Sequence, residues 1–338
     1  MIKKPRLLLI ITLNKGVINM NNFKKIGLTA LAGSLVATSA YAGEVTVSGG
    51  ASMAVKNNSG TDGGKSWTMG NQLTFSGGGE LDNGLNVSIS FVLDQADNEI
   101  DVDTTGADAP FDSHSITVSS DTLGSVTMAG EGSSSAHSAL DTTAAGDIFD
   151  NGFGISSPAS SDAADGSLLY TLPSLMDDLT LTASYSGGTT AVESTTAIGV
   201  TYTGVEGLSV SYGAGEMGST AANASGDATT LKASYAYGSF TAAISNTEID
   251  YDAAAGEDDE ISSWKVSYTV TDDLSISYGE ETHETNNESV DEEVEQISAS
   301  YTTGGMTVSL SQTEATGADH STSLGTQERW KLGLSFAF

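Results

Sequence analysis

The chain has 338 residues, of which 44 are acidic and only 12 are basic, and it contains no cysteine. No disulfide can therefore form, and a field this negative repels nucleic acid and attracts metal cations. Self-repulsion of this size also disfavours a small, compact soluble body. A nucleic-acid-binding protein and a disulfide-stabilised scaffold are thus excluded.

The first 42 residues have the composition of an export signal. They contain Lys and Arg but no Asp or Glu, and Lys24 and Lys25 precede an apolar stretch over 26–37. The small-x-small pattern of Ala40, Tyr41 and Ala42 follows, which predicts a signal peptide over 1–42 that is cleaved after Ala42. A membrane anchor is the alternative, but the apolar stretch is shorter than the roughly 20 residues that a spanning helix needs. Either the signal is long, with an extension over 1–19, or translation begins at Met20.

The exported part, 43–338, is a single domain of alternating segments. It carries six Lys and Arg against 44 Asp and Glu, a formal charge of −38. From Glu44 onward apolar and polar residues alternate with a period of two, which is typical of strands with two different faces and argues against disorder. In chain order the rule gives sixteen segments, the clearest being those at 45–55, 85–93, 179–185, 208–212, 264–270 and 330–338.

The connections between these segments alternate between short and long. Short ones with turn residues occur at 82–84, 121–124, 204–207, 238–239, 271–273 and 302–305. Long polar ones lie at 57–66, 95–113, 131–166, 187–195, 216–228, 247–260, 281–293 and 313–327. This asymmetry is typical of an antiparallel up-and-down barrel that crosses an outer membrane. The sequence therefore predicts an all-β transmembrane barrel of about 16 strands.

Aromatic residues and the polar face indicate which side meets lipid. The aromatic residues lie on the apolar face near segment ends, and they form an outer belt of Trp67, Tyr185, Tyr212, Trp264, Tyr278 and Trp330 and an inner belt of Tyr202, Tyr235, Tyr237, Phe240, Tyr268, Tyr301 and Phe338. Two such belts mark the two membrane interfaces. The opposite face is rich in Ser, Thr, Gly and Asn, which suits a water-filled lumen. Because an unpaired strand edge is costly in hydrocarbon, the first and last segments are expected to pair, and sixteen strands leave an aqueous channel.

The last segment carries a resemblance to a known family. Trp330, Leu332, Leu334, Phe336 and Phe338 alternate up to the last residue. This segment resembles the carboxy-terminal strand by which bacterial outer-membrane barrels are recognised for assembly. With the signal and the mature length, the chain resembles the sixteen-stranded general diffusion porins of Gram-negative bacteria. The resemblance implies a homotrimer, contact with lipopolysaccharide and lipid, and passive, weakly selective diffusion of small polar solutes.

In that family the third external loop folds inward and sets acidic groups against basic groups on the wall. The third long connection, 131–166, is the longest here and supplies Glu131, Asp141, Asp147 and Asp150. The wall departs from the family pattern because the first five segments contain no arginine and only Lys56 points inward by parity. Arg329 and Lys331 face the lumen on the same rule, as do Lys232 and Lys265. Carboxylates along a narrow path concentrate cations, so we expect a cation-favouring pore.

Two further groups of residues suggest ligands without a strong motif. Residues 101–112, with Asp101, Asp103 and Asp112, only partly match a calcium loop, because Asp112 replaces the usual Glu and Pro110 intrudes. A solvated loop is the simplest interpretation, and no cofactor is expected beyond loosely held Ca²⁺ or Mg²⁺ among the external acids. Of the four histidines, His137 lies on the third connection, where it would add charge below about pH 6.5.

Two other classes of function remain open at this point. An outer-membrane hydrolase would need a serine elbow or a histidine metal motif, and neither pattern occurs in the sequence. A plugged receptor or structural barrel would carry distinctive contact residues in its loops, whereas these loops are mostly Gly, Ala, Ser, Thr, Asp and Glu. The expectation is a channel and not an enzyme.

Overall fold

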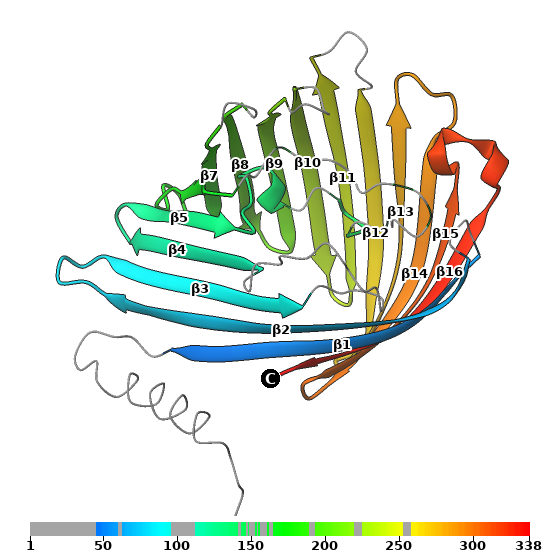
Figure 1. Cartoon of the computed structure of the whole chain (residues 1–338), viewed down its shortest axis with the longest axis horizontal. Coiled ribbons are helices and arrows are strands. Elements are labelled where there is room, and N and C mark those ends of the chain that lie inside the picture. Colours follow the sequence, from blue (N-terminus) through cyan, green and yellow to red (C-terminus); the bar gives the residue numbers. More distant parts are fainter. Residues whose placement is uncertain are drawn as a thin grey trace, which may run out of the picture. The chain divides into compact units, whose positions relative to one another are not determined.

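The exported part folds into sixteen antiparallel strands (Figure 1). The structure, a computed structural model, describes residues 45–59, 63–95, 112–140, 143–146, 148, 153, 155, 161, 165–188, 193–219, 225–252 and 258–338. The first eight strands are β1 (Thr46–Asn58), β2 (Gly64–Glu80), β3 (Asn86–Gln95), β4 (Ser113–Ser120), β5 (Gly124–Glu131), β6 (Ser167–Thr171), β7 (Leu179–Ser186) and β8 (Thr195–Val205). The others are β9 (Leu208–Met217), β10 (Gly226–Tyr237), β11 (Phe240–Tyr251), β12 (Asp259–Thr271), β13 (Leu274–Thr285), β14 (Glu292–Thr303), β15 (Met306–Thr316) and β16 (Gln327–Ala337).

The sheet closes on itself, as the sequence predicts. Each strand pairs with its sequence neighbours, and β1 pairs with β16 from Gly50 opposite Ala337 to Asn58 opposite Arg329. Two backbone bonds extend this seam, because Gly49 and Phe338 exchange N–H···O=C bonds of 2.7 and 2.9 Å. No edge is left in the strand order, which satisfies the backbone polar groups that hydrocarbon would leave unpaired.

The outward face is apolar, and its aromatic side chains are exposed. Trp67 is 70% exposed, and the other large exposed side chains on this face include Met69, Leu73, Ile244 and Leu310. Neighbouring strands bring aromatic pairs together at both ends: Trp264 with Tyr278 at a centroid separation of 5.3 Å, and Phe240 with Tyr268 at 4.7 Å. Such a large exposed apolar surface is typical of contact with lipid.

The short connections are tight turns at one end of the barrel. Gly84 and Gly238 have φ angles of 79° and 58°, a left-handed conformation that favours glycine over residues with a Cβ. The β6–β7 connection, 172–178, is longer than the others at this end, and β6 has only five residues. Within the described part of the chain, no helix is both long enough and apolar enough to cross a bilayer.

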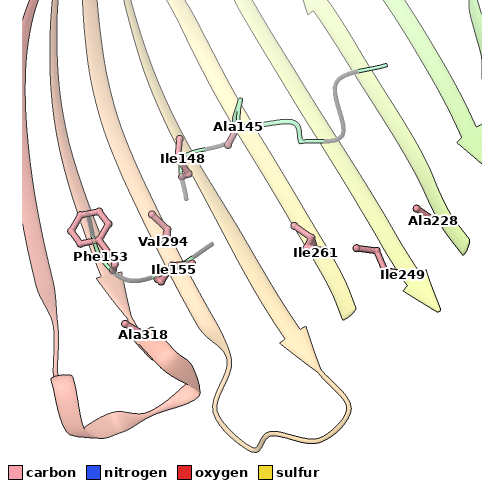
Figure 2. Packing of buried hydrophobic residues seen from close by; sticks show 10 residues of the cluster. Ala145, Ile148, Phe153, Ile155, Ala228, Ile249, Ile261, Val294 and Ala318 are labelled. Carbon is pink, nitrogen blue, oxygen red and sulfur yellow. The ribbon is translucent and has the colours of Figure 1, made fainter. Parts of the chain in front are cut away.

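An apolar cluster lies inside the barrel, at the end with the long connections (Figure 2). The third connection contributes Ala145, Ile148, Phe153 and Ile155. These residues pack against wall and loop residues that lie on the lumen side, namely Ala228, Ile249, Ile261, Val294, Ala315 and Ala318. The inner face, which the sequence predicts to be rich in Ser, Thr, Gly and Asn, is therefore apolar at this end, where these wall residues are buried.

Candidate channel constriction

The third connection, 131–166, is attached to the inner wall through its backbone. Three of its amides donate to serine hydroxyls on strands far away in the sequence, and each serine lies on the face opposite the exposed apolar residues. The three bonds, each 2.8 Å long, run from the amide of Ala136 to Ser184, from that of Ala144 to Ser245 and from that of Ala145 to Ser263. Since the wall supplies a partner at each of these positions, the described part of the connection follows the lumen side of β7, β11 and β12.

Two wall lysines hold the carbonyl groups of the same segment. Lys232 of β10 donates to the carbonyl of Thr143 at 2.9 Å, and Lys265 of β12 donates to that of Ala145 at 3.2 Å. Amides thus meet hydroxyls while carbonyls meet ammonium groups, so both kinds of backbone group are satisfied without secondary structure. The two lysines face the lumen as predicted, and they also act as tethers.

A buried carboxylate completes the attachment. Glu281 of β13 is fully buried and accepts the amide of Ile148 at 2.7 Å through Oε2. Its other oxygen accepts the hydroxyl of Ser263 at 3.2 Å. A carboxylate removed from water is strongly destabilising unless it is bonded in this way, so Glu281 fixes the position of the segment beyond Ala145.

His137 is buried and neutral, which contradicts the sequence expectation. Its Nδ1 accepts the amide of Ser161 at 3.1 Å, so the proton lies on Nε2, which donates to the hydroxyl of Thr230 at 2.8 Å. Burial lowers the pKa of His137 from 6.5 to about 4. The ring therefore adds no charge to the pore near pH 6, and it serves as a structural anchor.

Glycines on the wall allow the connection to come this close. A Cβ on Gly199 of β8 would lie 2.6 Å from the carbonyl oxygen of Ala136, and one on Gly213 of β9 would lie 2.9 Å from the ring of His137. Both distances are below normal contact, so a side chain here would push the connection away from the wall.

Comparisons with known proteins identify the family of the chain. A family model described as "Gram-negative porin" matches residues 27–307. The chain belongs to the Gram-negative porin family. Membership makes it a β-barrel channel of the outer membrane, for which the outward apolar face is suited. No curated protein sequence matches the chain.

Solved structures of porins have the same fold. The anion-selective porin from Comamonas acidovorans is 16% identical with a TM-score of 0.66, and the match covers 88% of this chain and 100% of that chain. OmpT of Vibrio cholerae, folded in vitro and in its trimer form, is 14% identical with a TM-score of 0.67, covering 88% and 99%. A mutant of the porin of Rh. blastica is 13% identical with a TM-score of 0.61, covering 87% and 100%.

The basic residues predicted for the constriction of this porin meet at the seam between β1 and β16. Lys56 lies opposite Lys331, and Arg329 precedes Lys331 by two residues on β16. Arg329 is only 5% exposed, and its guanidinium lies 4.9 Å from the ring centroid of Phe153. Lys56 and Lys331 thus differ from Arg329, whose guanidinium is covered by the third connection. Sequence parity places all three on the lumen side and cannot show this difference.

The predicted acidic side is described only in part. Glu131 lies at the end of β5, where its Oε2 is 3.9 Å from Nδ1 of His114. Asp141, Asp147 and Asp150 lie outside the described residues, as do Asp101 and Asp103 of the calcium-like segment. Asp112 is described and exposed, and its amide donates to the carbonyl of Val92 at 2.9 Å.

Acidic side chains also gather at the barrel end with the long connections. A cleft there is lined by six carboxylates from β11 to β13 and the connection before β12, namely Glu248, Asp250, Asp258, Asp259, Glu260 and Glu284.

Sequence reasoning missed two groups of residues that position the third connection: the wall residues that hydrogen-bond to its backbone and the apolar wall residues against which it packs. One signal was present: Ile249, Ile261 and Val294 break the alternation, because each is apolar at an inward position.

Proposed function

We propose that this porin forms an open, water-filled channel for passive diffusion of small hydrophilic solutes and ions. The observation that carries the proposal is a closed sixteen-stranded barrel with an apolar outer face, because that number of strands leaves an aqueous interior. The role is non-enzymatic, which the family supports. The third connection narrows the channel without filling it.

Conductance in a planar bilayer tests this function. We expect stepwise current increases as purified protein inserts, together with swelling of liposomes in small sugars but not in large oligosaccharides. A plugged receptor or structural barrel would insert and give no steps. That result would overturn the channel and favour the plugged barrel.

We propose that the constriction lies between the third connection, with Glu131, Asp141, Asp147 and Asp150, and the wall residues Lys56, Arg329 and Lys331. Cations pass preferentially, because the exported part has a formal charge of −38 and acidic side chains gather at the barrel end with the long connections. The anion-selective porin from Comamonas acidovorans has the same fold, so the fold itself does not set the sign. A reversal potential measured under a salt gradient tests the preference, and a clear anion preference would contradict it.

The assembled porin is proposed to be a homotrimer that reaches the outer membrane after cleavage of residues 1–42. The trimer form of OmpT from Vibrio cholerae supports the oligomer. The side chain of Phe338 is 73% exposed at the end of the chain, where the assembly machinery would recognise it. Lipopolysaccharide and lipid would surround the barrel. Mass determination of the detergent-solubilised protein tests the trimer, and amino-terminal sequencing of the exported protein tests the cleavage.

A further inference from the structure

Two histidines and a glutamate converge where two long connections meet the barrel. His283 on β13 lies opposite Glu292 on β14, and His320 comes from the 3-10 helix η3 (Ala318–His320) between β15 and β16 (Figure 1). One ligand atom of each residue lies within 4.8 Å of the others. Imidazole nitrogen and carboxylate oxygen are ligands of zinc and of other transition metals.

Each of the three side chains is oriented through an atom other than the one that converges. His320 donates from Nδ1 to the carbonyl of Val290 at 2.9 Å, so the lone pair of its neutral ring is on Nε2. The Nε2 of His283 lies 3.3 Å from the carboxylate of Asp259, and its Nδ1 lies 3.1 Å from Oε2 of Glu292, so a metal ion would replace the proton that Nδ1 and Oε2 share. A metal-binding histidine is held through its second nitrogen by a carbonyl or a carboxylate in the same way.

Glu292 has the same division of roles. Its Oε1 accepts the amide of Asp319 at 3.0 Å, while Oε2 points to both histidines and the residue is 4% exposed. Distances from Oε2 are 3.1 Å to Nδ1 of His283 and 3.8 Å to Nε2 of His320. A tetrahedral zinc ion with bonds of about 2.1 Å holds its ligands about 3.4 Å apart, so the two distances bracket the required value.

One nitrogen of each histidine faces Oε2 of Glu292, a residue that is nearly buried, so a single divalent cation among these three atoms would bond to all of them. We propose that His283 Nδ1, His320 Nε2 and Glu292 Oε2 bind one divalent transition-metal ion such as Zn²⁺, with water in the fourth position. Bound metal joins the β15–β16 connection to the β13–β14 hairpin at the channel mouth.

The test uses full-length detergent-folded protein stripped of metal with EDTA and titrated with Co²⁺ as a spectroscopic stand-in for Zn²⁺. We expect one equivalent of Co²⁺ to give the visible absorption of a tetrahedral complex, and Zn²⁺ to displace it. His320→Gln lies outside the strands and should abolish that absorption, and Asp259→Asn should weaken binding roughly 10–100-fold.

Two matched controls separate ligation from general attraction to an acidic surface. Glu292→Gln should lose Co²⁺ while Glu293→Gln, the exposed neighbour on the other face of β14, should retain it, and His114→Gln should also retain it. Heat-dependent gel mobility confirms that each variant is folded. No tetrahedral absorption in the folded wild type, or equal affinity in His320→Gln and wild type, would overturn the site. Neither result depends on conductance.

Discussion

At the scale of single residues, the two lysines at the seam bear on ion selectivity. Lys56 and Lys331 lie opposite each other on the lumen side, whereas Lys65 lies on the outward side of β2. Replacing both inward lysines with Gln removes positive charge from the path, so cation preference should increase and the reversal potential should shift accordingly. Lys65→Gln also removes one positive charge, but on the side of the wall away from the lumen, so it should shift the reversal potential less. Equal shifts per charge in the two variants would place the lysines outside the conduction path.

His137 predicts a pH dependence of the third connection. The anchored ring has a pKa lowered to about 4, while a detached ring has its ordinary pKa of 6.5. Above 6.5 both are neutral and anchoring is complete. As the pH falls from 6.5 to about 4, only the detached ring binds a proton, so anchoring weakens by on the order of 3 kcal/mol in total.

Open-channel current noise measures this loss. We expect noise in the wild type to rise over that pH range. His137→Gln should not show the same rise, because its amide can donate to Thr230 but cannot titrate. Identical noise profiles in the two proteins would assign the effect to other groups.

Gly199 tests how closely the connection approaches the wall. Gly199→Ala places a Cβ against the carbonyl of Ala136, and overpacking of this kind costs about 1–3 kcal/mol. The melting temperature in detergent should fall and the conductance should change. Gly187→Ala is the control, because no atom lies within 4 Å of its added Cβ. If the two variants have the same melting temperature, the connection does not approach the wall closely at Gly199.

At the scale of elements, the third connection is held by serines that no local pattern marks. The double variant Ser245→Ala and Ser263→Ala leaves two buried amides without acceptors, at a cost of roughly 1–3 kcal/mol each. Frequent closures should appear in single-channel records. The control removes Ser277 and Ser298, which bond to each other on the inner wall at 2.7 Å. Closures in the control alone would contradict the tether assignment.

The strands could be predicted from sequence, and the tethers could not. Period-two alternation follows from backbone geometry and needs no knowledge of neighbouring strands, so the strands can be located from the local sequence. The contact of Ser263 with Ala145 joins residues 118 positions apart, and serine is common throughout the inner face. His137 was misinterpreted for the same reason, because its burial depends on Ser161 and Thr230 and not on its own neighbours in the chain.

At the scale of the whole molecule, closure and outward apolarity were both predictable, because hydrocarbon tolerates neither a free strand edge nor exposed polar backbone. The apolar cluster around Phe153 was not predictable, because it depends on where a long connection lies relative to Ile249 and Ile261. Charge can likewise be predicted only in part. The net charge follows from the sequence, but the burial of Arg329 under Phe153 depends on the fold.

A porin of this kind requires its apolar face to meet lipid, and tryptophan side chains provide a fluorescent probe of that face. All three tryptophans, Trp67, Trp264 and Trp330, lie on the outward side. In proteoliposomes, lipids with brominated acyl chains should quench most of the tryptophan fluorescence, while aqueous iodide should quench little of it. Strong quenching by iodide with no effect of brominated lipid would place these side chains in water and contradict a lipid-facing apolar surface.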